Sequence, residues 1–200
     1  MTTKLITPES GIVAGRRTFL RSTGAATLSA TAVALIVGCE SMAQGTMSNP
    51  ASDVATLNVA LGLEHEAINA YQLGAESKLL QPAVLNVAVL FQDHHKQHRD
   101  ALIATIRKMG GTPVGEKSKD EYARALNAGS LGNQTDVLKL AQRLEKGAAN
   151  AYLGVIPSFK ENNGLSQVAA RLAADETMHW TALSGVLNDM LPQKALSFGA

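Results

Sequence analysis

Cysteine is nearly absent from this chain of 200 residues: Cys39 is the only one, so no disulfide can form within the chain. Aromatic residues are also scarce, at 4% of the sequence, whereas alanine and leucine are abundant, and this composition favours an all-helical protein. Neither sign of charge dominates. The formal net charge is +1, and no block of basic residues is present, alone or alternating with aromatics, which argues against a nucleic-acid partner. The length suits one domain with appendages.

The first 38 residues have the pattern of an export signal. The basic stretch R-R-T-F-L-R at residues 16–21 precedes an uncharged run from Ser22 to Cys39, and this combination resembles a twin-arginine signal. The run is short and rich in Ala, Gly, Ser and Thr, whereas a membrane span needs roughly 20 mainly apolar residues, so a transmembrane anchor is the weaker interpretation. We therefore expect export of the protein to the periplasmic or cell-envelope side of the membrane.

Cys39 ends this uncharged run in a second recognisable pattern. Residues 35–39 read L-I-V-G-C, which resembles a bacterial lipobox, in which the cysteine is lipidated and becomes the first residue of the mature protein. The multiple acyl chains of such an anchor hold a protein stably on a membrane. We therefore expect membrane attachment through Cys39, a tether over residues 39–50, a domain over 51–192 and a tail over 193–200. Without residues 1–38 the chain has 14 basic and 16 acidic residues and is mildly acidic.

The domain contains an internal repeat at an offset of 81 residues. Residues 63–71 read L-E-x-x-A-x-N-A-Y, and residues 144–152 repeat this pattern. Residues 95–102 read H-x-x-H-x-x-A-L, and residues 176–183 read E-x-x-H-x-x-A-L. Each copy thus carries one acid on a first segment and a pair of metal-binding residue types, three apart, on a second. Two such copies would build one dinuclear metal site between four helices.

Apolar residues recur at alternating three- and four-residue steps in four segments, which predicts four helices at about 54–75, 84–106, 138–156 and 172–190. Pro50 and Ser52 suit the start of the first helix, and Ser166 is a candidate cap for the fourth. The dipeptide at 81–82 separates the first two helices, and residues 162–164 separate the last two.

The connection between the second and third helices is unusually long. About 24 residues lie between Gly110 and Thr135, which is more than most loops in compact domains have. They are enough to run the length of a bundle, with a short helix at about 120–126. One long crossover between two antiparallel helical hairpins is the ferritin-like form of the all-α four-helix bundle.

Six acids and histidines lie on the apolar faces of these four predicted helices, at positions where core residues are expected. A single buried acid or histidine is usually a hydrated edge residue or a satisfied core residue. Six of them at a similar depth are better explained by metal binding, because buried charge is costly unless it is paired or bound to a metal. The predicted ligands are Glu64, His95, His98, Glu145, Glu176 and His179.

Over residues 51–192 the chain resembles the ferritin-like superfamily, in particular its exported bacterial branch. The most specific match is D-E-x-x-H at residues 175–179. Glu64 and Glu145 match the single glutamates of the family's first and third helices, and His98 matches the histidine of the second. The resemblance implies terminal ligands at Glu64 and Glu145, a bridging carboxylate at Glu176, and one imidazole for each metal from His98 and His179.

His95 departs from this pattern, because the family has glutamate at that position. A carboxylate can bridge two cations, whereas a neutral imidazole offers one lone pair, and three carboxylates remain instead of four. Unless another ligand bridges, the ion near His95 is expected to be held differently, to be labile or to be missing. We expect two divalent metal ions. The added nitrogen shifts preference away from manganese towards iron, zinc or copper, and iron is the first choice.

Four further residues are candidates for supporting the ligands. The family resemblance implies that Asp175 orients a ligand histidine, and His94 occupies the equivalent position in the other copy, although surface exposure is the favoured interpretation for it. Tyr71 and Tyr152 each follow a predicted glutamate ligand by two helical turns. We favour ordinary core aromatics for both, and the alternative is a hydrogen bond to the ligands or a radical-capable tyrosine near the metals.

The predicted function is a dinuclear metal oxidase of ferroxidase or peroxide-consuming type, with dioxygen or peroxide as the small-molecule substrate. No catalytic residue other than the ligands is identified. The absence of a Cys-x-x-Cys pair excludes a rubredoxin-like electron donor within the chain and argues against a peroxidase linked to NADH. The alternatives are a non-catalytic metal-binding or stress-associated envelope lipoprotein and a structural lipoprotein whose acids and histidines pair with one another. A lipid tether suits a monomer or homodimer better than a 24-subunit shell.

Overall fold

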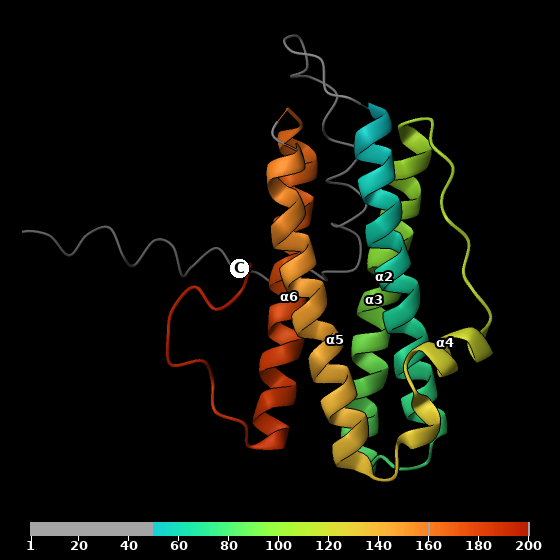
Figure 1. Ribbon diagram of the computed structural model, residues 1–200, viewed down its shortest axis with the longest axis vertical. Coiled ribbons are helices and arrows are strands. Elements are labelled where there is room, and N and C mark those ends of the chain that lie inside the picture. The colour runs from blue at the N-terminus through green and yellow to red at the C-terminus, as the bar shows by residue number, and fades with distance from the viewer. Residues whose placement is uncertain (1–49, 160, 200) are drawn as a thin grey trace, which may run out of the picture.

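The computed structural model describes residues 50–159 and 161–199, which contain five α-helices and no strand (Figure 1). Helix α2 (Pro50–Glu76) packs against α3 (Pro82–Lys108), and α5 (Gln134–Val155) packs against α6 (Asn163–Leu187). This confirms the ferritin-like bundle of two helical hairpins. The predicted signal, Cys39 and most of the tether lie outside the described residues. Among the helices that are described, none is long and apolar enough to cross a membrane.

Two of the predicted helix boundaries show how local chemistry sets them. Helix α3 begins at Pro82, with Gln81 as its N-cap, because proline at the first helical position lacks only an N–H that has no helical partner. Helix α6 begins at residue 163, and the side chain of Asn162 accepts a hydrogen bond from the Leu165 N–H at 3.2 Å. The prediction that Ser166 caps α6 was therefore wrong. Ser166 lies inside the first turn and donates to the Phe159 carbonyl at 3.1 Å.

The long connection crosses from one end of the bundle to the other (Figure 1). It contains the short helix α4 (Lys119–Ala125), within a residue of the predicted position, and the 3₁₀ turn η2 (Ala128–Ser130). Asn58 on α2 holds the start of this connection, because its amide donates to the Thr112 carbonyl at 3.0 Å and accepts from the Val114 N–H at 2.7 Å. Because the connection runs along the whole bundle, α5 starts at the same end of the bundle as α3.

The apolar core is divided into two parts along the bundle. One cluster lies at the end where α2 and α6 begin, and it includes Leu61, Leu102, Ile106 and Leu172. A smaller cluster lies at the opposite end and consists of Tyr71, Phe91, Leu138 and Leu183. Between the two clusters, the four helices carry a layer of buried acids and histidines.

The C-terminal segment folds back on the second hairpin. Phe198 meets Trp180 edge to face, with ring centroids 5.1 Å apart, and the Gly199 N–H donates to the Asn150 side chain at 2.8 Å. The part of the predicted tail that the structure describes is therefore attached to α5 and α6. Trp180 points to this tail rather than to the ligands.

Candidate metal centre

The structure brings all six predicted ligands into one buried layer. Every one is at most 8% exposed, and Glu176 and His179 are fully buried, a position that ionised groups occupy only when they are paired or bind a cation. Each helix contributes to the layer in the order that the repeat predicts. Helix α2 carries Glu64, α3 carries His95 and His98, α5 carries Glu145, and α6 carries Glu176 and His179.

Two overlapping groups of four can each surround one cation. The first consists of Glu64, His95, His98 and Glu176, and the second of His95, Glu145, Glu176 and His179. Within each group, one nitrogen or carboxylate oxygen per residue lies within 4.8 Å of the others. His95 and Glu176 belong to both groups, so the two positions share two side chains. This is the arrangement of a dinuclear centre.

The ring of His95 lies between the glutamates of the two hairpins. Its Nδ1 is 2.9 Å from Oε2 of Glu64, and its Nε2 is 3.3 Å from Oε1 of Glu145. The two ring nitrogens therefore face different groups of ligands. A histidine at this position reaches both sides of the centre, as the glutamate of the resemblance would.

Glu176 faces the two remaining histidines with its two oxygens. Oε1 is 3.2 Å from Nδ1 of His98, and Oε2 is 3.4 Å from Nδ1 of His179. Nevertheless, neither oxygen of Glu176 nor Nδ1 of His98 makes a hydrogen bond within the described part of the chain. Buried polar atoms that make no hydrogen bond cost about 1–3 kcal/mol each. Cations between these atoms would satisfy all three, so the residues present fit a metal centre.

Attraction between the acids and the imidazoles outweighs burial in setting the pKa values of Glu64, His95 and His98. Burial raises the pKa of Glu64, but the hydrogen bond with His95 and the nearby imidazole of His98 outweigh it and lower the pKa to about 2. Burial lowers the pKa of His95, but Glu145 and Glu64 raise it to about 10. The pKa of His98 is raised against burial in the same way, to about 12, by Asp175, Glu176 and Glu64. Without metal, the imidazoles hold protons that a cation must displace.

The carboxylate shared by the two groups behaves differently. For Glu145, hydrogen bonds with His179 and His95 outweigh burial and lower the pKa. For Glu176, burial outweighs the facing imidazoles and raises the pKa. The shared carboxyl is thus the acid of the layer that is hardest to ionise without a cation beside it.

The two tyrosines connect the hairpins to each other. The Tyr71 hydroxyl donates to Oε1 of Glu145, and the Tyr152 hydroxyl donates to Oε1 of Glu64. Each tyrosine therefore supports the glutamate of the other copy. Burial and the adjacent carboxylates raise the pKa of both tyrosines well above the ordinary value, so the phenols stay protonated and act as donors. Both tyrosines are thus buried core aromatics whose hydroxyls also bind predicted ligands, as the hydrogen-bonding interpretation expects.

Asp175 lies behind His98 on the outer side of the centre. Its Oδ2 is 3.3 Å from Nε2 of His98, while Nδ1 of the same ring faces Glu176. A carboxylate that binds the outer nitrogen of a ligand histidine fixes the orientation and the tautomer of the ring. The aspartate acts across the hairpins, because Asp175 is on α6 and His98 is on α3.

His94 is the counterpart of Asp175 in the other copy. It is half-buried rather than exposed, and its Nδ1 is 2.9 Å from Nε2 of His179. Burial lowers the pKa of His94, and the charges of His179 and His98 lower it further, so His94 is neutral and can accept a hydrogen bond from His179. The favoured prediction that His94 is exposed at the surface was therefore wrong.

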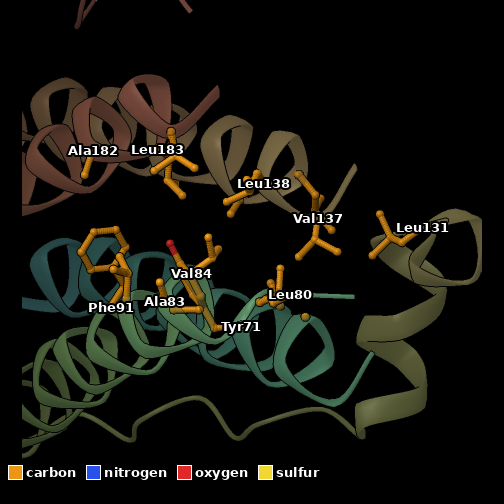
Figure 2. Close-up of a pocket in the computed structure, with 17 residues that line it drawn as sticks. Tyr71, Leu80, Ala83, Val84, Phe91, Leu131, Val137, Leu138, Ala182 and Leu183 are labelled. Carbon is orange, nitrogen blue, oxygen red and sulfur yellow. The ribbon is translucent and has the colours of Figure 1, made fainter. Parts of the chain in front are cut away.

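One contact of the centre has no sign in the repeat. The ring of Phe91 stacks on His179, with centroids 4.1 Å apart and an interplanar angle of 26°. Phe91 and Tyr71 also line an apolar cavity of about 290 Å³ on the side of the centre where α3 begins (Figure 2). The periodic pattern identifies Phe91 as a core residue, but not as the cover of a ligand.

Comparison with known proteins agrees with this architecture. The ferritin-like domain family matches residues 52–189. The crystal structure of a conserved hypothetical protein, rv2844, from Mycobacterium tuberculosis has a similar fold, with a TM-score of 0.59 and 22% identity over 73% of this chain and 97% of that one. No curated protein matches the chain significantly. Because the family match spans well over half of its length, the chain belongs to the ferritin-like domain family.

Proposed function

We propose that this protein binds two divalent metal ions, iron in preference to others, and acts as an oxidase of ferroxidase or peroxide-consuming type. The observation that carries the proposal is the pair of overlapping four-residue groups that share His95 and Glu176. Two iron ions held in this way would each supply one electron, which matches the two-electron reduction of peroxide, or of dioxygen to peroxide.

Each ligand has a role that follows from its position. Glu64 and His98 would hold one ion, and Glu145 and His179 would hold the other. Glu176 would contact both, since its two oxygens face His98 and His179 separately. The outer partners of the ligands would keep the rings and carboxylates in place, because each makes a hydrogen bond across the hairpins.

His95 decides how the second ion is held. Three carboxylates leave one positive charge of two divalent ions uncompensated. The nitrogens of His95 face opposite groups, so a ring that has lost both protons could bind one ion at each nitrogen and supply the missing negative charge. A ring that keeps one proton would bind one ion only, and the other position would be weaker.

The proposed location is the cell envelope. The twin-arginine pattern and the lipobox ending at Cys39 support export and attachment through a lipid anchor. A protein tethered in this way would meet iron and peroxide outside the cytoplasm, as a monomer or homodimer. Mass spectrometry of the mature protein from membranes tests this: the expected N-terminus is a diacylated Cys39, and an unmodified chain that keeps residues 1–38 contradicts it.

The function is tested by metal content and oxygen consumption. We expect about two iron ions per chain after anaerobic loading and a burst of oxygen or peroxide consumption when Fe²⁺ is added. A Glu176→Ala, His179→Ala double variant should lose both. Asp93→Ala is the matched control, because Asp93 is an exposed acid on α3 outside both groups. Absence of bound metal in the unmodified protein would overturn the proposal.

A second candidate function is metal binding without turnover, as in a stress-associated envelope protein. It is favoured by one specific observation, the imidazole at residue 95 in place of the expected acid. In this case about one ion, or two weakly held ions, should bind, and Fe²⁺ should not accelerate oxygen consumption. Metal content and oxygen consumption therefore separate the two candidates.

A further inference from the structure

An elongated cavity lies between the two hairpins, beside the candidate metal centre. Its volume is about 290 Å³, roughly twice that of an apolar protein cavity known to bind benzene. Figure 2 shows side chains from both hairpins facing each other along its length. Phe91 and Ala182 lie at one end of the row, and Leu131 lies at the other.

The cavity has almost no polar surface. Among the side chains that line it, only Tyr71 carries a polar atom, and its hydroxyl already donates to Glu145. A water molecule needs two to four polar partners to occupy a cavity stably, and these walls do not provide them. No charged side chain lines the cavity either. A molecule that fills it must therefore present carbon on all sides.

The walls also reach solvent through apolar residues. Val87 on α3 and Val186 on α6 line the cavity and are 38% and 49% exposed. Leu80 and Leu131 are half-buried at the end away from the metal layer. An occupant can therefore enter without passing a charged residue, and a polar head group could stay in water at the mouth.

We propose that this cavity binds the alkyl chain of a single-chain amphiphile, such as a fatty acid or fatty alcohol. An extended chain suits the elongated shape, and the volume accommodates one such chain rather than two. The inner end of the chain would rest against Tyr71 and Phe91, which contact Glu145 and His179. Binding of this kind does not depend on bound metal, so it goes beyond the oxidase function and can fail or succeed independently of it.

The chain-length dependence of binding tests the proposal. Calorimetry with 1-octanol, 1-decanol and 1-dodecanol, below their solubility limits, should show one molecule per protein chain. Affinity should rise about fourfold for each added CH₂ until the cavity is full, which corresponds to about 0.8 kcal/mol per buried group. Replacing decanol by decanoate should change affinity much less than removing two carbons. No binding, or affinity that follows the head group and not the chain, overturns the proposal.

Variants that fill the cavity locate the site. Ala88→Phe and Ala141→Phe add a ring from opposite hairpins, and each should weaken decanol binding about tenfold or more while keeping the melting temperature and the metal content. Ala170→Phe on the exposed side of α6 is the matched control and should bind decanol normally. If one filled variant does not fold, the other decides. Equal affinity in the filled and control variants would show that decanol binds at another site, and it would overturn the proposal. The proposal also fails if the protein is a dimer that binds decanol only after Val186→Asp dissociates it, because a second copy then covers this surface.

Discussion

The two helical hairpins carry the same pattern but differ in how they contribute to the centre. The first supplies Glu64, His95 and His98, and the second supplies Glu145, Glu176 and His179. At the equivalent positions His95 and Glu176, one residue is a base whose pKa is raised to about 10, and the other is an acid whose pKa is also raised. The comparison teaches that an imidazole and a carboxylate can occupy the two shared positions of one layer while differing in charge.

The supporting residues show the same near-symmetry. Asp175 from the second hairpin binds His98 of the first, and His94 from the first binds His179 of the second. In the same way, the tyrosine of each hairpin donates a hydrogen bond to the glutamate of the other hairpin. Each half of the centre thus depends on the other hairpin, and changes in matched pairs of residues can measure how equal the halves are.

Removal of the shared carboxylate should have the largest effect. Glu176→Gln keeps the shape of the side chain but removes the negative charge that faces both His98 and His179. We expect loss of both ions, with affinity reduced by about a hundredfold or more. Metal analysis after dialysis measures this. Retention of one tightly bound ion would show that the two halves are independent.

Replacing the tyrosines tests the cross-connection. Tyr71→Phe and Tyr152→Phe each leave a buried, ionised glutamate without one donor, and each should destabilise the metal-free protein by about 1.5–3 kcal/mol. Tyr122→Phe is the control, because its hydroxyl accepts from the Lys117 N–H in the crossover and contacts no ligand. Urea unfolding measures all three. Equal losses from Tyr71 and Tyr152 support near-symmetry, and a loss no larger than that of Tyr122 contradicts the proposed role.

The outer partners of the histidines should have a smaller effect, and an unequal one. Asp175→Asn removes an ionised partner from His98 and should weaken metal binding about tenfold or more. His94→Ala removes a neutral partner from His179 and should cost less, because hydrogen bonds to charged groups are the stronger ones. Competition with a chelator gives both affinities. A larger loss of metal affinity in the His94 variant than in the Asp175 variant would contradict this prediction.

His95→Glu makes the two hairpins alike. The fourth carboxylate should raise the affinity for Mn²⁺ relative to Zn²⁺ by about tenfold, because oxygen ligands suit the harder ion. His98→Glu is a useful contrast, since it adds a carboxylate in one group only. Calorimetric titration with each ion measures the change. An unaltered metal preference would mean that His95 does not bind the ions.

The remaining prediction concerns the pH dependence of the metal-free protein. The raised pKa values of His95 and His98, about 10 and 12, stabilise the fold below the ordinary histidine pKa of 6.5, and this contribution declines as pH rises towards 10. The lowered pKa of Glu64 contributes above pH 4.5 and is lost as pH falls towards 2. Urea unfolding should show greatest stability between pH 4.5 and 6.5. Stability that rises from pH 7 to 9 contradicts this charge assignment.

Much of the centre is predictable from the sequence because helical periodicity assigns residues to faces. Residues three apart share a face, so His95 pairs with His98 and Glu176 with His179 without knowledge of the fold. The position of Ser166 shows where local rules are insufficient. Serine is a good cap, but Asn162 stands four residues earlier with the same chemistry and is the N-cap of the helix.

The sequence by itself determined the repeat, the four helices, the long crossover and the six side chains that meet, because spacing along a helix and loop length are local properties. Only the tertiary structure decided which tyrosine binds which glutamate, that His94 turns inward to His179, and that a cavity opens beside Phe91. The physical reason is that periodicity specifies a face of a helix, whereas the neighbour that the face meets depends on how the two hairpins pack together.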